Sequence, residues 1–391
     1  MTAPSDGDTP SIEQRAAIAA RLRSAIEGSF AHWDAVPDLD FESAFDAYIE
    51  EALKAETRLG FVLASQRLVA QLRNGHTGFH DDRVMRRHGR SFGLLLRPLG
   101  DVWTVTISRH AELTVGSVVE TIDGAPVAET FARARPFLAA SSDRAAADSL
   151  FFRRHLLPDA LTLGLEGGAT FTVAKGEWPV VEVPLPAVRY GERGVAVLAI
   201  ASFDGPRFEA AAVGAVRTLD RDAPLVIDLR GNGGGNTPLE LLAALMDRPY
   251  RRWRSTVLAT TTLRRAHEEK PEPVIYEAPR HEPGAGAHRG RLALVIDATV
   301  GSAAEDFVMP FKDNGRAVLV GDTTAGSSGQ PHRLDLGDGM LAWVGAKREC
   351  FPDGRTFEGI GIAPDIRVIT TPEDLACGRD PALAAALAAV R

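Results

Sequence analysis

Two cysteines among 391 residues, Cys350 and Cys377, are too few and too far apart in sequence to indicate a disulfide framework or a cysteine-based metal site. Basic charge is not in excess either, because 44 Lys and Arg stand against 52 Asp and Glu. Nucleic acid and anionic membranes are therefore not expected partners. No stretch approaches the roughly 18 apolar residues that span a membrane, and the first residues lack the basic start and apolar run of a secretion signal. We therefore expect a soluble, cytoplasmic protein.

The pattern of apolar residues divides the chain into three sections. From about residue 10 to 73, apolar residues recur three and four apart, which predicts helices. From about 91 to 176, short alternating runs such as VWTVTI predict a small β module. From about 192, continuous Val, Leu and Ile strands alternate with helices, which is typical of an α/β domain with mostly parallel strands. We expect domains at residues 1–90, 91–180 and 181–391, and a charged, proline-rich surface loop at 264–289.

A glycine-rich turn, DLRGNGGGN at 228–236, follows one of the predicted buried strands. Such turns expose backbone N–H groups, and ligands of open α/β sheets bind at the carboxyl ends of the strands. A dinucleotide site is disfavoured because its fingerprint would need glycine where Asn236 stands. We interpret the turn as a nest of donors for a transient oxyanion, with Gly233 and Gly234 as candidates.

The stretch ATVGSAAEDF at 298–307 places Ser302 between a predicted strand and a predicted helix. Ser302 and Glu305 have the spacing of a capping box, in which each side chain bonds a backbone N–H of the helix start. A hydroxyl there also lies at the positive end of a helix dipole, where the Ala303 N–H could stabilise a substrate oxyanion. A nucleophilic serine needs a base within about 3 Å. The local sequence supplies none, so both interpretations remain open at this point.

Four motifs together resemble a known family: NGHTGF at 74–79, DLRGNGGG at 228–235, GSAAEDFVMPFKDNGRAVLVGDTTAG at 301–326 and GIGIAPDI at 359–366. In this order they are similar to the C-terminal-processing, or tail-specific, serine peptidases. Relatives of that family include the tricorn protease core and the retinoid-binding repeats of the photoreceptor matrix. The resemblance covers most of the chain. It implies a crotonase-like (ClpP-like) α/β core of parallel strands and helices, preceded by an N-terminal helical section and a PDZ-like β module.

The resemblance also implies which residues would be catalytic, with Ser302 as the nucleophile. In the bacterial and chloroplast processing enzymes the base is a Lys about 25 residues later, but Ser327 stands there in this chain. In the tricorn-like branch the base is a His that ends the helical section, which corresponds to His76. In that branch an acidic residue just before the Gly-x-Pro-Asp-like signature orients the base, and Glu358, before GIGIAPDI, has this position.

Three further positions follow from the same resemblance. The serine that precedes the base in tricorn-like sites is Gly75 here, so a relay through that hydroxyl is missing. Asp313 matches an acidic position of the family and, like Ser327, is a candidate for the surroundings of the site. His76 and His80 are four residues apart, but Gly78 between them disfavours a helix, so neither a metal nor another cofactor is predicted.

The segment LTVGSVVETIDGAPV at 113–127 resembles a strand pair of PDZ domains, whose sheet edge binds a peptide carboxyl terminus as an added strand. No carboxylate-binding loop is recognisable in SFGLLL, so tail binding stays open. The sequence thus predicts a serine peptidase for peptide or protein substrates. Its alternatives are a non-catalytic binding protein on the same fold and a small-molecule esterase or amidase. The oligomeric state is not predicted.

Overall fold

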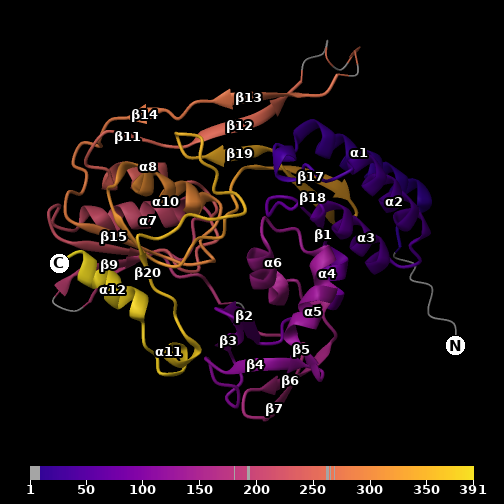
Figure 1. Cartoon of the computed structure of the whole chain (residues 1–391), viewed down its shortest axis with the longest axis horizontal. Coiled ribbons are helices and arrows are strands. Elements are labelled where there is room, and N and C mark those ends of the chain that lie inside the picture. The colour runs from indigo at the N-terminus through magenta and orange to yellow at the C-terminus, as the bar shows by residue number, and fades with distance from the viewer. Residues whose placement is uncertain (1–8, 180, 192–193, 261–263, 265, 268) are drawn as a thin grey trace.

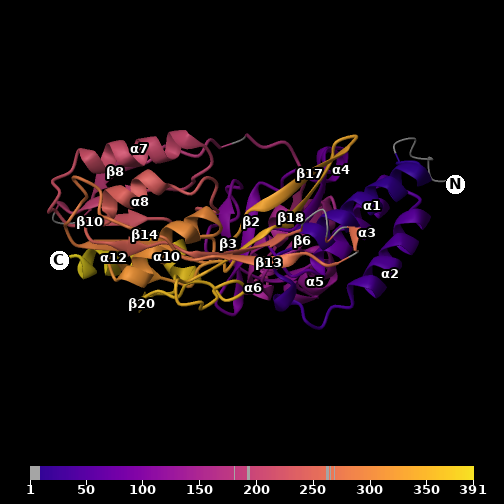
Figure 2. The same ribbon diagram turned by 90° about the horizontal axis from the view of Figure 1, so that it is seen from above.

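The computed structural model describes residues 9–179, 181–191, 194–260, 264, 266–267 and 269–391. An α/β core and an N-terminal helical section lie at opposite sides of the molecule, and a β module lies below the helical section in the view of Figure 1. Figure 2 shows that the core and the helical section form the two ends of an elongated molecule. Among the described residues, no helix has the length and apolar character needed to cross a membrane.

The predicted N-terminal helices are present, and their apolar faces pack on one another. At the start of each α-helix, the side chain of the preceding residue accepts a hydrogen bond from a backbone N–H of the first turn. These capping residues are Ser11, Asp40 and Thr57. Leu22 and Phe61 are fully buried in the shared core. The elements are α1 (Ile12–Ser29), a 3-10 turn η1 (Trp33–Ala35), α2 (Phe41–Lys54) and α3 (Arg58–Ala70).

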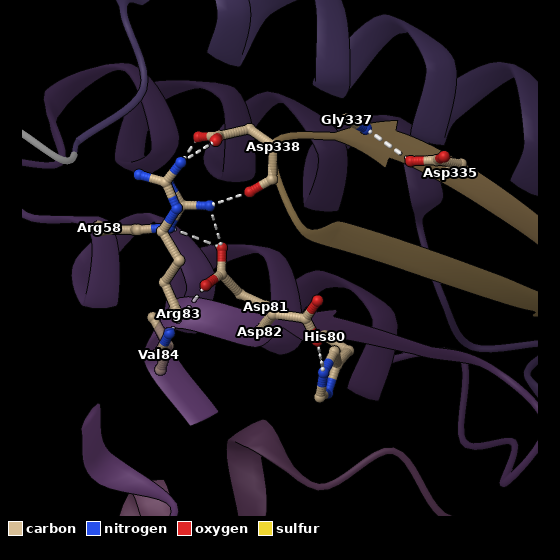
Figure 3. Close-up of polar contacts among 9 residues, drawn as sticks. All are labelled: Arg58, His80, Asp81, Asp82, Arg83, Val84, Asp335, Gly337 and Asp338. Carbon is tan, nitrogen blue, oxygen red and sulfur yellow. Dashed lines mark hydrogen bonds and ion pairs between the residues drawn. The ribbon is translucent and has the colours of Figure 1, made fainter. Parts of the chain in front are cut away.

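A short strand after these helices joins them to a hairpin from the other end of the chain. β1 (Gly78–Asp81) pairs antiparallel with β18 (Met340–Gly345), which pairs with β17 (Pro331–Gly337). The buried Arg58 of α3 forms ion pairs with Asp81 at 2.8 Å and with Asp338 of the hairpin turn at 2.7 Å (Figure 3). Helix α4 (Asp82–His88) follows, and the Asp81 side chain caps its start. β1 is therefore held by both the helical section and the hairpin.

The β module has one antiparallel sheet in the order β2-β3-β4-β6-β7, with β5 beside β4. Its core includes Phe92, Leu96 and Phe151. The strands are β2 (Leu94–Leu99), β3 (Val102–Ser108), β4 (Val118–Ile122), β5 (Ala125–Pro126), β6 (Ala160–Leu165) and β7 (Thr170–Ala174). The helices are α5 (Val127–Ala134) and α6 (Asp143–Ser149), with 3-10 turns η2 (Arg135–Phe137), η3 (Leu150–Phe152) and η4 (Arg154–Leu156).

The core sheet has the order β20-β16-β15-β10-β9-β8, and it is parallel except for β8 at one edge. Its strands are apolar on both faces because helices cover both. In β15, Leu292, Leu294 and Ile296 face α7, α8 and α10, whereas Ala293 and Val295 face α12. The strands are β8 (Ala187–Tyr190), β9 (Ala196–Ala199), β10 (Leu225–Asp228), β15 (Leu292–Ile296), β16 (Val318–Gly321) and β20 (Ile366–Arg367). The helices are α7 (Pro206–Arg217), α8 (Leu239–Leu245), α10 (Ala303–Asn314), α11 (Pro372–Ala376) and α12 (Pro381–Ala389).

The expectation of a surface loop at 264–289 is wrong for part of that stretch. β13 (Glu272–Tyr276) pairs with β12 (Arg254–Ala259), and β14 (Arg280–His281) pairs with β11 (Tyr250–Arg251). Val274, Ile275 and Tyr276 form only a short apolar run among charges and prolines, so the strand was not recognised. β12 also pairs with β19 (Lys347–Cys350), and this sheet lies between the core and the helical section in Figure 1.

Candidate active site

Ser302 lies where the chain turns from β15 into α10, on the carboxyl side of the parallel strands. Its φ of 54° is in the left-handed region, and a residue other than glycine adopts this backbone conformation at a cost of about 1–3 kcal/mol. The Ser302 N–H donates to the Ser327 carbonyl at 2.8 Å, and this bond holds the turn. A strained serine between a strand and a helix presents its hydroxyl outward, as nucleophilic serines of α/β folds do.

The predicted capping box at this helix is wrong. The Ser302 side chain makes no cap hydrogen bond, because its backbone is not extended as an N-cap requires. Glu305 points away from the helix start and accepts hydrogen bonds from the Thr324 hydroxyl at 2.5 Å and from the N–H groups of Gly326 and Ser327 at 2.8 Å each. It is fully buried, and burial raises the pKa of Glu305 to about 8. Glu305 therefore fixes the loop after β16 rather than the helix.

His76 reaches Ser302 from the turn between α3 and β1. Its Nε2 lies 2.8 Å from Ser302 Oγ, and its Nδ1 lies 3.1 Å from Ser327 Oγ. The Asn74 side chain accepts the His76 N–H at 3.1 Å, which shapes the turn. Burial lowers the pKa of His76 to about 4, with a smaller opposing effect from the charge of Glu349. The imidazole is therefore neutral near pH 7 and can accept a proton.

Glu358 lies close to this turn, but among the residues that the structure describes it forms no hydrogen bond with the imidazole. One oxygen accepts hydrogen bonds from Asn74 Nδ2 at 2.9 Å and from the Ser141 hydroxyl at 2.6 Å, and the other accepts the Ser328 N–H at 2.9 Å. Burial raises the pKa of Glu358 to about 7, against the hydrogen bonds, which lower it. Glu358 thus joins the His76 turn, the β module and the loop after β16, and any effect on His76 passes through these partners.

The glycine-rich turn after β10 lies against Ser302. A Cβ atom on Gly234 would lie 2.7 Å from Ser302 Cβ and 2.9 Å from the Ala303 nitrogen. The Gly234 N–H donates to Asn232 Oδ1 at 2.9 Å, which corrects its expected role, because that donor is already used. Within the part of the chain that the structure describes, the N–H groups of Gly233 and Ala303 have no hydrogen-bond partner. These two remain the candidate oxyanion donors, and Ala303 also opens α10.

Substitution of Gly234 by alanine should destabilise the fold and displace the turn from Ser302. The new methyl group would overlap Ser302, and the φ of 104° at Gly234 is strained for any L-residue. We expect a loss of about 1–3 kcal/mol in the free energy of unfolding, measured by urea denaturation. Gly233→Ala is the matched control for stability, because no atom lies within 4 Å of a Cβ there and its φ is not positive. Equal stability of the two variants would contradict the close approach.

Asp313 does not join the site. It lies near the far end of α10, where it pairs with Arg251 at 3.2 Å. Lys312 pairs with Asp365, and Lys347 lies 2.7 Å from Glu349. Among the described residues, neither lysine forms a hydrogen bond with Ser302 or His76, and Ser327 stands at the sequence position where the processing enzymes of the family carry their lysine.

A buried carboxyl pair beside the site escaped the sequence analysis. Asp306, one helical turn after Ser302, accepts a hydrogen bond from the Thr237 hydroxyl at 2.8 Å, and Glu349 of β19 is fully buried next to it. Burial and the charge of Glu349 raise the pKa of Asp306 well above its ordinary value. No sequence pattern around Asp306 or around Glu349 indicated that these two residues meet. Asn74, in contrast, could be recognised as a turn residue, because asparagine before glycine is typical of turns.

A hydroxyl, a neutral imidazole and unpaired N–H groups at the carboxyl ends of parallel strands are the parts of a serine-hydrolase site on an α/β fold. Residues 194–368 match Peptidase family S41, which confirms the resemblance to the C-terminal-processing serine peptidases. The match includes Ser302, the glycine-rich turn and Glu358, whereas His76 lies outside it.

Two curated relatives and one solved structure extend this finding. The chain is 32% identical to a tricorn protease homolog of Streptomyces coelicolor over 161 residues, which are 41% of this chain and 12% of that protein. It is 32% identical to the chloroplastic carboxyl-terminal-processing peptidase 3 of Arabidopsis thaliana over 79 residues, 20% of this chain and 15% of that protein. The structure of mature CPAF complexed with lactacystin has a similar fold, with a TM-score of 0.72 and 16% identity over 94% of this chain and 95% of that one. The matched region is thus a small part of both curated relatives, and the solved structure supports the mixed α/β fold.

Proposed function

We propose that the protein is a serine peptidase that cleaves peptide bonds of protein or peptide substrates through an acyl-enzyme. Ser302 is the nucleophile, His76 is the general base, and the N–H groups of Gly233 and Ala303 are the oxyanion donors. The observation that carries the proposal is the 2.8 Å contact between His76 Nε2 and Ser302 Oγ, two residues 226 positions apart. Glu358 is the acid that orients the base, acting through Asn74 and the loop after β16.

In the proposed reaction, Ser302 Oγ attacks the substrate carbonyl carbon while its proton moves to His76 Nε2. The carbonyl oxygen becomes negative and accepts hydrogen bonds from the oxyanion donors, each worth roughly 3 kcal/mol of transition-state stabilisation. The imidazolium then protonates the leaving amine as the peptide bond breaks. A water molecule, deprotonated by the same imidazole, hydrolyses the ester and releases Ser302.

The substrate class and the finer architecture belong to the same proposal. The family match and the names of the two curated relatives favour peptide substrates, with cleavage near a free carboxyl terminus as the tail-specific alternative. We assign residues 181–391 to a crotonase-like catalytic core, 91–180 to a PDZ-like module and 1–90 to the helical section that supplies His76. The antiparallel sheet of the middle section and the mainly parallel core sheet are consistent with this division.

A peptide library tested beside simple esters distinguishes this function from its alternatives. We expect the wild-type protein to hydrolyse peptides and Ser302→Ala, equally folded by circular dichroism, to hydrolyse none. Turnover of esters with intact peptides would identify an esterase instead. No turnover of either class by well-folded protein would favour a binding protein. Peptides with free and amidated carboxyl termini would show whether the terminus is recognised.

The pH dependence of the reaction should report the lowered pKa of His76. A base must be unprotonated to accept the Ser302 proton, so lowering its pKa extends activity toward acid. We expect kcat/KM to rise with pH through about 4 and to have reached its plateau below the ordinary imidazole value of 6.5. The profile should be measured on a short peptide that carries no ionisable side chain. A midpoint near 6.5 would show that the imidazole is more hydrated than this structure indicates.

A further inference from the structure

The His76 ring is bracketed by two hydroxyl groups. Nε2 faces Ser302 Oγ at 2.8 Å, and Nδ1 faces Ser327 Oγ at 3.1 Å. For Nε2 to act as the base, the ring hydrogen must be on Nδ1, and its acceptor is then the Ser327 oxygen. The only side chain that contacts Nδ1 among the described residues is therefore a hydroxyl, not a carboxylate.

Ser327 is held in this place by its own backbone. Its N–H donates to the buried carboxyl group of Glu305 at 2.8 Å, and its carbonyl accepts the Ser302 N–H at 2.8 Å. The bond between the Ser302 N–H and the Ser327 carbonyl joins Ser327 directly to the proposed nucleophile. These two bonds therefore hold the backbone of Ser327 beside His76 and Ser302.

Gly75 leaves the space that this hydroxyl occupies. A Cβ atom on Gly75 would lie 2.4 Å from Ser327 Oγ and 3.2 Å from Ser327 Cβ, with the next atom, Ser141 Oγ, at 3.5 Å. The φ of Gly75 is not positive, so its backbone conformation does not by itself require glycine. Glycine is therefore required at 75 for room, and a side chain at 75 competes with the one at 327 for the same volume.

We propose that Ser327 is the positioning residue that fixes the reactive tautomer of His76, and that its hydroxyl can be transferred to position 75 once the side chain at 327 is removed. This inference rests on the proposed roles of Ser302 and His76. The hydroxyl accepts the Nδ1–H of the neutral ring and accepts it more strongly from the imidazolium that forms when Ser302 loses its proton. Its removal should slow the reaction of Ser302 about 10- to 100-fold, as expected for a hydrogen bond to a charged group.

The test compares Ser327→Ala, Ser327→Gly, Gly75→Ser and the double variant Gly75→Ser/Ser327→Gly. The second-order rate of labelling by a fluorophosphonate is measured from pH 3 to pH 9, and Tm is measured for each protein. We expect both single changes at 327 to lower the plateau rate about 10- to 100-fold. Gly75→Ser alone should also be slow because of the overlap, whereas the double variant should be at least about fivefold faster than Ser327→Gly.

A second measurement does not depend on catalysis. Nitrogen-15 NMR of His76 in a Ser302→Ala background should show the Nδ1–H tautomer in the presence of Ser327, a mixture in Ser327→Ala, and the Nδ1–H tautomer again in the double variant. Ser29→Ala is the matched control, because Ser29 Oγ lies 2.9 Å from His332 Nδ1 in an exposed serine–histidine pair. It should change neither the labelling rate nor the His76 tautomer.

The two measurements separate the failure of this inference from the failure of the proposed function. Absence of labelling in the wild type together with the expected tautomer pattern would reject the peptidase and retain the role of Ser327. Rapid labelling of Ser327→Ala, within twofold of wild type over the whole pH range, would overturn the inference. So would a double variant that folds with wild-type Tm but stays as slow as Ser327→Gly.

Discussion

Replacement of His76 by alanine should slow the reaction of Ser302 by about 10³-fold or more, with little change in stability. His76 is the only side chain within hydrogen-bond distance of Ser302 Oγ among the described residues, and burial keeps its ring neutral near pH 7. Without it, the serine hydroxyl has no base, because Glu358 and Glu305 bond to other groups. The rate of fluorophosphonate labelling and kcat/KM on a peptide should fall together.

His80→Ala is the control for this experiment. His80 is four residues later and partly exposed, and its Nε2 lies 3.0 Å from Asp82 rather than near the site (Figure 3). The His80→Ala variant should react with the fluorophosphonate at the wild-type rate. If His76→Ala retained more than a tenth of the wild-type rate, His76 would not be the base, and a different proton acceptor would have to be sought.

Replacement of Asp81 by alanine should lower the free energy of unfolding by about 3–5 kcal/mol, because it leaves the buried Arg58 guanidinium without its fully buried charge partner. The two side chains are 3% and 0% exposed and lie 2.8 Å apart. Asp81 also caps α4 and ends the strand that carries the His76 turn (Figure 3). The substitution should therefore weaken the attachment of His76 to the core as well as the helical section itself. Urea denaturation followed by far-UV circular dichroism measures the change in the free energy of unfolding.

Arg73→Ala gives the comparison for an exposed pair. Arg73 and Asp38 are 52% and 60% exposed, so loss of their 2.7 Å ion pair should cost only about 0–1 kcal/mol. A loss below 1 kcal/mol in Asp81→Ala would show that Arg58 finds other partners, and the carboxylate of Asp338 at 2.7 Å is the one already in place.

The elements that a period of 3.6 or a run of buried residues defines were predictable from the sequence. The helices of the N-terminal section lie within residues 10–73, where the pattern places them, and parallel strands alternate with helices in the core, as expected from about residue 192. β13 was missed because it is exposed along its whole length and therefore leaves no hydrophobic period. The capping box was a wrong inference from local spacing, since the loop after β16 offers Glu305 better donors than its own helix does.

The residues proposed for catalysis could be named from motifs, but their surroundings could not. Asn74 bonds Glu358 across 284 residues, and Glu349 meets Asp306 from a strand with no distinctive pattern. These contacts depend on how β1 pairs with β18 and how β19 pairs with β12, and strand register is set by tertiary packing rather than by any local signal. Asp313 was named from the family pattern alone, and it lies at the far end of α10, where it pairs with Arg251 instead of joining the site.

The most direct test of the central claim is to locate the covalent adduct. Wild-type protein treated with a fluorophosphonate at neutral pH should gain the mass of one adduct, and tandem mass spectrometry of the digest should place it on Ser302. His76→Ala should show the same mass only after much longer exposure. An adduct on another residue, or none on protein shown to be folded, would contradict the assignment of Ser302 as the nucleophile.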